Sequence, residues 1–429
     1  MKLITCLIIM LGVLLILGIP IYIALFFSSL ISLFFFSDYN LGIAAQRIFG
    51  GIDKFAIMAM PFYIFAASIM LKGGMSKRIL DFASSLIGNI RGKVALTTQL
   101  ACMFFGSLCG SSPATVAAIG SFMYPELKEN NYGEKFATGL IASSGSVSLL
   151  IPPSITFIVY GATTGVSIGS LFIAGLGAGI VYGGLVLAYS YYYACKVGTS
   201  DNEGAKANLK NIVDQTKKSI WALGVPVIIL GGIFTGFFTP TEAAAVSTVY
   251  ALLVVTFIYK EMNLKLLYDV CLDSSATIAQ LMMLLGTAAL FGWVMSISFV
   301  PQMLTAHIVS IIDSQYAFLL IINIVFLIAG MFIDTGAAVM IFTPIIFQPA
   351  MQMGIDPVHL GVVIVANMCI GMFSPPFGLN LFVASSFVDM PIIEIYKAIV
   401  PFILLALATL LILTYVPSIS LFLPNLMGY

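Results

Sequence analysis

Two pairs of adjacent prolines stand at matched positions in the two halves of the 429-residue chain. Pro152-Pro153 follows Ser111 at the same distance along the chain at which Pro375-Pro376 follows Asp334. The polar residues and the prolines all interrupt Gly-containing apolar segments, and one constant shift in residue number superposes the two sets. This internal repeat predicts two halves that fold alike, each with a polar break followed by a proline break.

The proline pairs could supply ligands for a cation. Proline has no backbone N–H, so in a regular helix each proline leaves the carbonyl four residues earlier without its donor. A free carbonyl in hydrocarbon is costly unless something binds it, and unwound carbonyls coordinate Na⁺ in many secondary transporters. The breaks therefore predict two sodium sites. The carbonyls freed in this way belong to Ser148, Leu149, Gly371 and Met372.

The polar breaks upstream of the prolines add further oxygens and begin helices. Ser112 before Pro113 has the form of an N-cap followed by proline at the first helical position. A helix that begins there points free N–H groups and a positive dipole end at the break, which suits a carboxylate. We therefore expect an organic anion to bind beside the sodium sites. The oxygens at the two breaks belong to Gly110, Ser111, Ser112, Asp334 and Thr335.

The segments that must position these residues are strongly apolar. Apolar residues make up 60% of the chain and charged residues only 8%, against about 25% in ordinary soluble domains. This composition predicts a polytopic membrane protein. The 18 basic and 18 acidic residues cancel, which argues against nucleic-acid binding. The six cysteines are scattered without a CxxC pair and are expected to be small apolar residues.

Several kinds of chemistry are excluded by missing motifs. The chain has no GxxxxGK[ST] loop, so uphill transport would need an ion gradient or another chain. Asp334-Thr335-Gly336 spells the aspartic-protease tripeptide, but no second such motif supplies the partner carboxylate. No HExxH motif is present either. We therefore expect neither an enzyme nor an organic cofactor, and no metal other than sodium.

Segment lengths indicate an interrupted helical architecture. The apolar stretch 3–36 is too long for one span and should contain two helices broken near Gly18-Ile19-Pro20. Segments 113–124, 154–163 and 377–388 are too short to span about 30 Å of hydrocarbon. Short, Gly- and Pro-interrupted segments predict re-entrant hairpins and broken helices, which are tolerated only where protein or a cavity covers them.

The distribution of charge suggests how the repeats are oriented. Loop 72–93 carries five basic residues and one acidic residue, whereas the equivalent stretch 296–316 has no Lys or Arg. The positive-inside rule places the first loop in the cytoplasm, so the two loops should lie on opposite membrane faces. We predict an all-α polytopic membrane protein built from inverted-topology repeats. Its expected parts are scaffold helices 1–50, a first repeat 51–195, a cytoplasmic linker 196–219, central scaffold helices 220–273, a second repeat 274–394 and a C-terminal helix 395–429.

Two acidic residues have open interpretations. Thr239-Pro240-Thr241-Glu242 fits a capping box with proline at the first helical position, but Glu242 could also be a buried functional carboxylate. Asp334 could be either a helix cap or an ion ligand. The proline pairs themselves could mark simple kinks, although the repeat argues for more.

With these motifs placed, nearly the whole chain resembles the large membrane subunit (DctM-like, or M subunit) of tripartite ATP-independent periplasmic (TRAP) transporters. Within the family the sequence looks closest to members that transport sialic acid. The motifs are specific only in combination. They are Met60-Pro61-Phe62-Tyr63, Gly110-Ser111-Ser112-Pro113-Ala114-Thr115, Ile151-Pro152-Pro153-Ser154, Phe238-Thr239-Pro240-Thr241-Glu242-Ala243, Gly354-Ile355-Asp356-Pro357-Val358-His359 and Pro375-Pro376-Phe377-Gly378-Leu379-Asn380.

The resemblance implies an elevator-type, Na⁺-coupled importer of organic acids in the bacterial inner membrane, with scaffold and transport parts. It also implies two partners, a small four-helix membrane subunit and a soluble periplasmic substrate-binding protein. The first sodium site is expected at Gly110, Ser111, Gly145, Ser148, Leu149 and Pro152. The second is expected at Asp334, Thr335, Gly336, Gly371, Met372, Ser374 and Pro376. The substrate anion is expected near Ser112, Ser154, Thr156, Thr335 and Asn380.

Two other functional classes stay open at this point. One is a stand-alone ion-coupled carboxylate transporter of the divalent-anion/sodium symporter type, which needs no binding protein. The other is a membrane scaffold without transport activity, which would leave the matched breaks unexplained.

Overall fold

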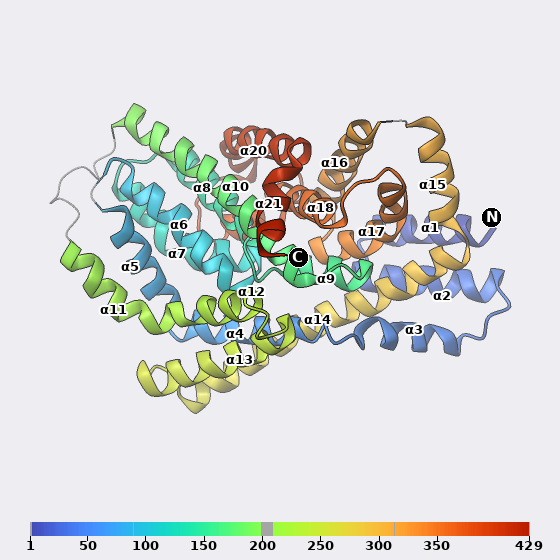
Figure 1. Cartoon of the computed structure of the whole chain (residues 1–429), viewed down its shortest axis with the longest axis horizontal. Coiled ribbons are helices and arrows are strands. Elements are labelled where there is room, and N and C mark those ends of the chain that lie inside the picture. Colours follow the sequence, from blue (N-terminus) through green and yellow to red (C-terminus); the bar gives the residue numbers. More distant parts are fainter. Residues whose placement is uncertain (1, 89, 199–208, 313, 429) are drawn as a thin grey trace.

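The computed structural model describes residues 2–88, 90–198, 209–312 and 314–428. Within these ranges the chain is helical and contains no strand (Figure 1). Six helical stretches are long and apolar enough to cross a membrane. The prediction of an all-α polytopic membrane protein is therefore confirmed. The six stretches are Ile168–Val197, Val213–Phe234, Pro240–Ile258, Leu264–Ile297, Gln315–Phe332 and Ile392–Tyr415.

The N-terminal apolar stretch forms two helices, as expected. The helices α1 (Lys2–Ile16) and α2 (Ile21–Phe36) are separated where Gly18 adopts a φ of +74°, a conformation that glycine takes at little cost, and Pro20 directly precedes α2. Three shorter helices follow before the first repeat motif. They are α3 (Gly42–Ile52), α4 (Ala59–Lys72) and α5 (Met75–Ile87).

The helices of the two halves follow the predicted repeat. The first hairpin is α6 (Lys93–Cys109) and α7 (Ser112–Glu129), and the second is α16 (Gln315–Phe332) and α17 (Thr335–Gln352). The shift in residue number that superposes the proline pairs also carries both bounds of α7 onto those of α17. The broken helices match as well. In the first half they are α8 (Glu134–Ser146), the 3₁₀ turn η1 (Val147–Leu149) and α9 (Ile155–Thr164), and in the second half α18 (Pro357–Gly371) and α19 (Leu379–Ser385).

A long helix follows each break, α10 (Ile168–Val197) and α20 (Ile392–Tyr415), and α21 (Pro417–Met427) ends the chain. Between the halves lie α11 (Leu209–Pro226), the π-helical η2 (Val227–Gly231), α12 (Gly232–Phe234), α13 (Pro240–Leu253) and the π-helical η3 (Val254–Ile258). Of the predicted linker 196–219, residues 199–208 lie outside the described part. The remaining helices are α14 (Leu264–Ile297) and α15 (Val300–Ile311).

The start of α13 decides one of the two open interpretations. The Thr239 hydroxyl accepts a hydrogen bond from the Glu242 N–H, and Glu242 accepts one from the Thr239 N–H at 2.8 Å. This is a complete capping box, with Pro240 at the first helical position. The Glu242 side chain therefore has the structural role that the sequence allowed.

Two groups of helices can be distinguished by their packing. The helix α14 packs against α2, α3 and α4, and α13 packs against α4. In Figure 1 these helices lie together along the lower edge. The hairpins and broken helices pack against one another, with α8 against α7 and α20, and α18 against α16. The helix α14 also contacts α17, so it lies between the two groups.

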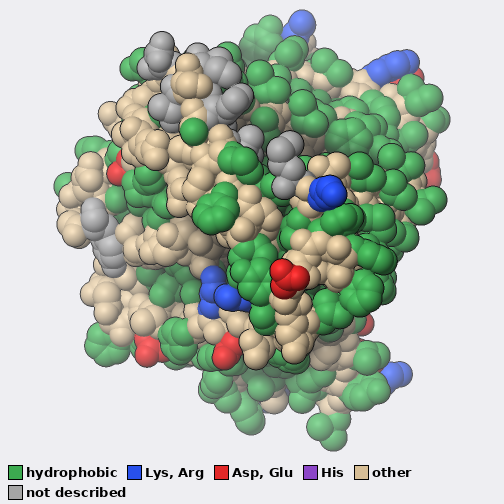
Figure 2. Space-filling model, turned by 90° about the vertical axis from the view of Figure 1, so that its right-hand side faces the viewer, with side chains coloured by type: hydrophobic (Ala, Val, Ile, Leu, Met, Phe, Trp, Pro, Cys, Tyr) green, Lys and Arg blue, Asp and Glu red, His purple; other side chains and the backbone are tan. Residues whose placement is uncertain are grey.

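The broken helices occupy the centre of the molecule. Every residue of α8 from Phe136 onward and every residue of α18 from His359 onward is buried. Protein also covers the non-helical backbone after α8, where every residue from Leu150 to Ser154 is buried, whereas Phe377 after α18 is exposed. The outer surface is largely apolar, with few charged side chains on the face shown in Figure 2. Exposed Ile16, Phe34, Phe35 and Phe237 belong to this surface, which suits a lipid environment.

Candidate functional site

The first hairpin tip is a tight turn between α6 and α7. Gly110 ends α6 with a φ of +58°, and Ser111 is extended. The helix α7 begins at Ser112, one residue earlier than the sequence indicated, so Ser111 and not Ser112 occupies the N-cap position. The Ser112 hydroxyl is not a cap; it donates to Asn380 Oδ1 at 2.9 Å. The expectation for Ser112 was wrong because its hydroxyl finds a buried partner in the other half of the chain.

The second hairpin tip is capped by its acidic residue. Asp334 is the N-cap of α17, and its Oδ2 accepts a hydrogen bond from the Gly336 N–H at 2.9 Å. Thr335 is the first residue of the helix. Asp334 therefore does cap the helix, whereas its role as an ion ligand stays a prediction.

The first proline break leaves carbonyls without backbone donors. Among the described residues, no backbone N–H donates to the carbonyl of Ser148 or Leu149, as the proline argument predicted. The Ser148 hydroxyl is occupied, because it donates to the Gly145 carbonyl at 2.7 Å. The hairpin tip lies directly against this break: a Cβ added to Gly110 would stand 2.5 Å from the Pro153 carbonyl oxygen. Only glycine allows this approach.

The second proline break differs from the prediction. The Gly371 carbonyl accepts from the Ser374 N–H at 3.1 Å, and the Met372 carbonyl accepts from the Asn380 N–H at 2.9 Å. The two carbonyls are therefore not freed, because the chain turns back after α18 and supplies other donors. A carbonyl oxygen has a second lone pair, so both can still bind a cation. The Ser374 hydroxyl donates to the Ile370 carbonyl at 2.7 Å.

Side-chain hydrogen bonds join each hairpin tip to the break of the other half. Besides the bond between Ser112 and Asn380, the Thr156 hydroxyl at the start of α9 donates to the Thr335 hydroxyl at 3.3 Å. Ser112 and Thr335 occupy equivalent positions in the repeat, each as the first residue of the helix after its tip. Asn380 also donates to the Ala142 carbonyl at 2.8 Å. The two halves thus form one connected unit around the tips and breaks.

A cavity of about 500 Å³ lies among the tips, the breaks and α14. It brings together nine of the predicted site residues: Gly110, Ser111, Ser112, Leu149, Thr156, Asp334, Thr335, Gly336 and Met372. Eight other predicted residues do not line the cavity: Gly145, Ser148, Pro152, Ser154, Gly371, Ser374, Pro376 and Asn380. The Ser154 hydroxyl caps α9 by accepting from the Phe157 N–H at 3.4 Å.

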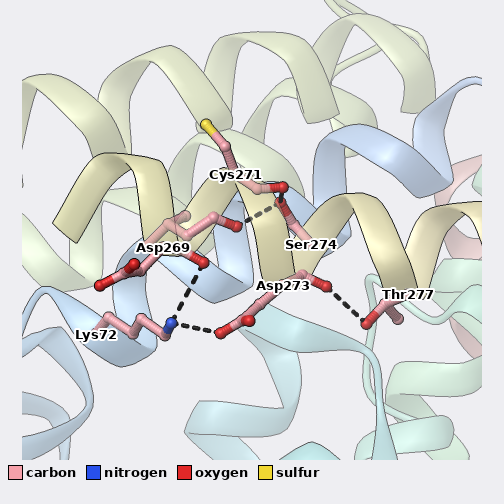
Figure 3. Close-up of polar contacts among 7 residues, drawn as sticks. Lys72, Asp269, Cys271, Asp273, Ser274 and Thr277 are labelled. Carbon is pink, nitrogen blue, oxygen red and sulfur yellow. Dashed lines mark hydrogen bonds and ion pairs between the residues drawn. The ribbon is translucent and has the colours of Figure 1, made fainter. Parts of the chain in front are cut away.

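Part of the cavity wall comes from residues that the sequence analysis did not single out. Thr277 and Gln280 of α14 line it, and so does Tyr22 at the start of α2. The only signal for Gln280 in the sequence was an amide among the apolar residues that follow Thr277. Asp273, one turn before Thr277 on α14, is paired with Lys72 of α4, and the Thr277 hydroxyl donates to the Asp273 carbonyl (Figure 3).

The lining has an unusual charge composition for a site expected to bind anions. No Lys, Arg or His is among the described residues that line the cavity, and Asp334 is the one charged side chain there. The N-terminal residues of α7, α9 and α17 line it, and each helix brings a positive dipole end. Ser154 and Asp334 each accept a hydrogen bond from one N–H group in the first turn of α9 and α17.

Comparisons with known proteins agree with this architecture. Residues 8–419 match the family model described as "Tripartite ATP-independent periplasmic transporter, DctM component". The chain is 40% identical to the C4-dicarboxylate TRAP transporter large permease protein of Pseudomonas aeruginosa, over 94% of this chain and 93% of the relative. It is also 40% identical to an isethionate TRAP transporter permease protein of Oleidesulfovibrio alaskensis, over 95% of this chain but only 64% of that relative's length.

A relative named for sialic acid, from Vibrio cholerae, is 34% identical over 96% of both chains. The expected closeness to sialic-acid members is therefore not confirmed, because relatives named for other substrates are more similar. The crystal structure of the Alcanivorax borkumensis YdaH transporter superposes with a TM-score of 0.60, covering 87% of this chain and 88% of that one at 13% identity. That likeness supports the fold alone.

The family match covers almost the whole chain, and the aligned relatives are transporter permeases rather than enzymes. The repeated hairpins, the broken helices and the six apolar spans fit such a permease. The chain belongs to the DctM family, the large permease component of tripartite ATP-independent periplasmic transporters, and is a multi-pass protein of the bacterial inner membrane.

Proposed function

We propose that the chain is a sodium-coupled secondary active importer of an organic acid anion. The observation that carries this proposal is the convergence of two hairpin tips and two helix breaks on a single cavity. Such discontinuous helices are the usual source of coupling-ion and substrate ligands in transporters built from repeats.

The first sodium ion binds at the first break in this proposal. The Ser148 and Leu149 carbonyls have no backbone donor among the described residues, and Gly110 holds the hairpin tip against the Pro153 carbonyl. Hard oxygen atoms at close quarters are what a small desolvated cation prefers. The second ion binds between the second tip and the carbonyls of Gly371 and Met372. Each of these carbonyl oxygens already accepts one backbone hydrogen bond and has one lone pair left for the ion. The two sites are therefore expected to differ in affinity.

The substrate anion is held at the helix N-termini that line the cavity. The helices α7, α9 and α17 begin there, and helix N-termini favour negative charge. The cavity offers no cationic side chain among its described lining residues, so the bound Na⁺ supplies the remaining positive charge. The relatives are named for a dicarboxylate, a sulfonate and a sugar acid, and the shared chemistry is that of a small organic anion.

Transport proceeds by an elevator mechanism in this proposal. The hairpins and broken helices are joined by the Ser112–Asn380 and Thr156–Thr335 bonds, and they would move as one body. The helix α14, packed on α2, α3 and α4, would be the fixed scaffold along which they slide. A separate small membrane subunit would cover part of the exposed apolar surface, and a periplasmic substrate-binding protein would deliver the anion.

Reconstitution into proteoliposomes tests the proposal. Uptake of labelled sialic acid, another sugar acid or a C4-dicarboxylate is measured with an inward Na⁺ gradient, in the presence of the small subunit and candidate binding proteins. We expect uptake to need Na⁺, the small subunit and the binding protein, and to proceed without ATP. Equal uptake when choline replaces Na⁺ would refute sodium coupling. Full uptake by the chain alone would instead support a stand-alone carboxylate carrier.

A further inference from the structure

One wall of the cavity is made by scaffold elements and carries polar side chains. Thr277, Gln280 and Leu284 of α14 line the cavity, and their spacing of three and four residues places them on one face of that helix. Tyr22 of α2 lines it too, and α2 packs against α14. These side chains come from elements outside the hairpins and breaks.

The polar groups on this wall are available to a ligand. Neither the Gln280 amide nor the Tyr22 hydroxyl has a hydrogen-bond partner among the described residues, and the Gln280 side chain is exposed. A glutamine amide offers two donors and an acceptor oxygen, and a phenol offers one donor and an acceptor. The Thr277 hydroxyl donates to the Asp273 carbonyl at 3.1 Å, so its lone pairs stay free to accept.

The same wall has no positive charge to offer. The ammonium group of Lys72 lies beside α14 one turn from Thr277, but it is paired with the Asp273 carboxylate (Figure 3). A second carboxylate placed against Gln280 and Tyr22 would find hydrogen-bond donors but no cationic side chain, so it would gain no ion pair there. A hydroxyl or amide group placed there would exchange water for protein hydrogen bonds at little cost.

We infer that Gln280, with Tyr22 and Thr277, forms an uncharged subsite that recognises hydroxyl or amide groups of the substrate. The substrate class is then a polyhydroxylated monocarboxylate: its carboxylate lies toward the hairpin tips and its neutral polar end toward α14. This inference rests on the proposed function, which places the anionic group at the helix N-termini. Gln280 is a specificity-determining residue in this proposal. The hairpins and broken helices bind the carboxylate end of the substrate, and α14 binds its neutral polar end.

Ligand-dependent thermal unfolding of the purified chain in Na⁺ buffer tests the inference. The probes are D-gluconate and N-acetylneuraminate, which carry hydroxyl groups, hexanoate, which has one carboxylate and no hydroxyl, and succinate, which has two carboxylates. The variants are Gln280→Leu and Tyr22→Phe. The matched control is Ser275→Ala, because Ser275 is an exposed polar residue of α14 that does not line the cavity.

We expect at least one hydroxylated probe to half-saturate the wild type at a lower concentration than hexanoate and succinate. Gln280→Leu and Tyr22→Phe should each weaken the binding of that probe about three- to tenfold, which corresponds to the loss of roughly one hydrogen bond. Hexanoate should be unaffected, and Ser275→Ala should behave as the wild type. The inference would be overturned if succinate bound most tightly to the wild type. It would also be overturned if both variants lost the same factor of affinity for the hydroxylated probe and for hexanoate. If no probe stabilises the wild type, the proposed anion site itself is refuted.

Discussion

The close approach of Gly110 to the first proline break allows a sharp test of the sodium site. Gly110 adopts a φ of +58°, and a Cβ added to it would lie 2.5 Å from the Pro153 carbonyl oxygen, where ordinary contact begins at 3.4 Å. Gly110→Ala must therefore move the tip and the break apart by about 0.5 Å to reach 3.0 Å, the limit of real Cβ contacts, and by about 0.9 Å to reach ordinary contact. Both partners are backbone, so no side-chain rotation can relieve the overlap.

A matched control separates this displacement from the cost of the left-handed conformation. Gly165, which ends α9, has a φ of +79° and nothing within 4 Å of an added Cβ. Gly165→Ala and Gly110→Ala both suffer the left-handed penalty of about 1–2 kcal/mol. Only Gly110→Ala also displaces the wall of the proposed ion site. Because oxygen–cation distances in such sites vary within a few tenths of an ångström, a shift of this size should abolish binding.

The assay is thermal unfolding across a Na⁺ titration with choline as the replacement ion. At a Na⁺ concentration ten times the dissociation constant, binding to the native state stabilises it by about 1.4 kcal/mol. We expect the unfolding temperature to rise with Na⁺ in the wild type and in Gly165→Ala. In Gly110→Ala we expect no such rise, whatever the stability of each variant without Na⁺. The same Na⁺-dependent increase in Gly110→Ala and Gly165→Ala would show that the tip of the first hairpin does not form the site.

Three further predictions can be checked on the same preparations. Asp334→Ala removes a helix cap, which should lower the free energy of unfolding by about 0.5–2 kcal/mol. If the Asp334 carboxylate also binds Na⁺, the Na⁺ concentration for half-maximal uptake rises in this variant. Lowered thermal stability with an unchanged Na⁺ requirement would show that Asp334 is a helix cap only. Lys54→Met removes the hydrogen bond that the ammonium donates to the Ala162 carbonyl at 2.7 Å, which joins the α3–α4 connection to α9. Because this contact must break when the two parts slide, we expect a changed initial transport rate at an unchanged Na⁺ requirement, and identical rates would count against an elevator movement at this interface. Single cysteines introduced as Lys77→Cys and Ser298→Cys on a cysteine-free background should react with impermeant reagents from opposite membrane sides, and labelling from one side would contradict the inverted repeat.

Much of the fold could be predicted from the sequence because the two halves of the chain carry the same pattern of breaks, so each half supports the helix arrangement predicted for the other. The glycine and proline at 18–20 separate α1 from α2 as expected, and the shift that superposes the motifs reproduces both bounds of the helices that follow the tips. The capping box at Glu242 is readable because its partners are close neighbours in the chain. Features set by local chemistry were therefore predictable.

The site was only partly predictable because its remaining features depend on contacts between distant segments. The Ser112–Asn380 hydrogen bond joins residues from opposite halves of the chain, and no local sequence pattern predicts it. The backbone donors for Gly371 and Met372 come from the way the chain turns after α18, which the missing N–H groups of the prolines do not specify. The cavity wall formed by Gln280 and Tyr22 depends on how α2 and α14 pack against the hairpin unit.

The lack of a cationic side chain among the described residues of the cavity lining has an electrical consequence. A carrier that balanced its substrate with a built-in arginine would return that fixed charge across the membrane in every cycle. Here, under the proposed coupling, the balancing charge travels with the substrate as Na⁺ and is released with it. Each Na⁺ in excess of the substrate's own charge makes the cycle electrogenic, and the membrane potential then adds about 2.3 kcal/mol per elementary charge for every 100 mV. Accumulation should therefore rise when a potassium diffusion potential makes the vesicle interior negative, even at a constant sodium gradient.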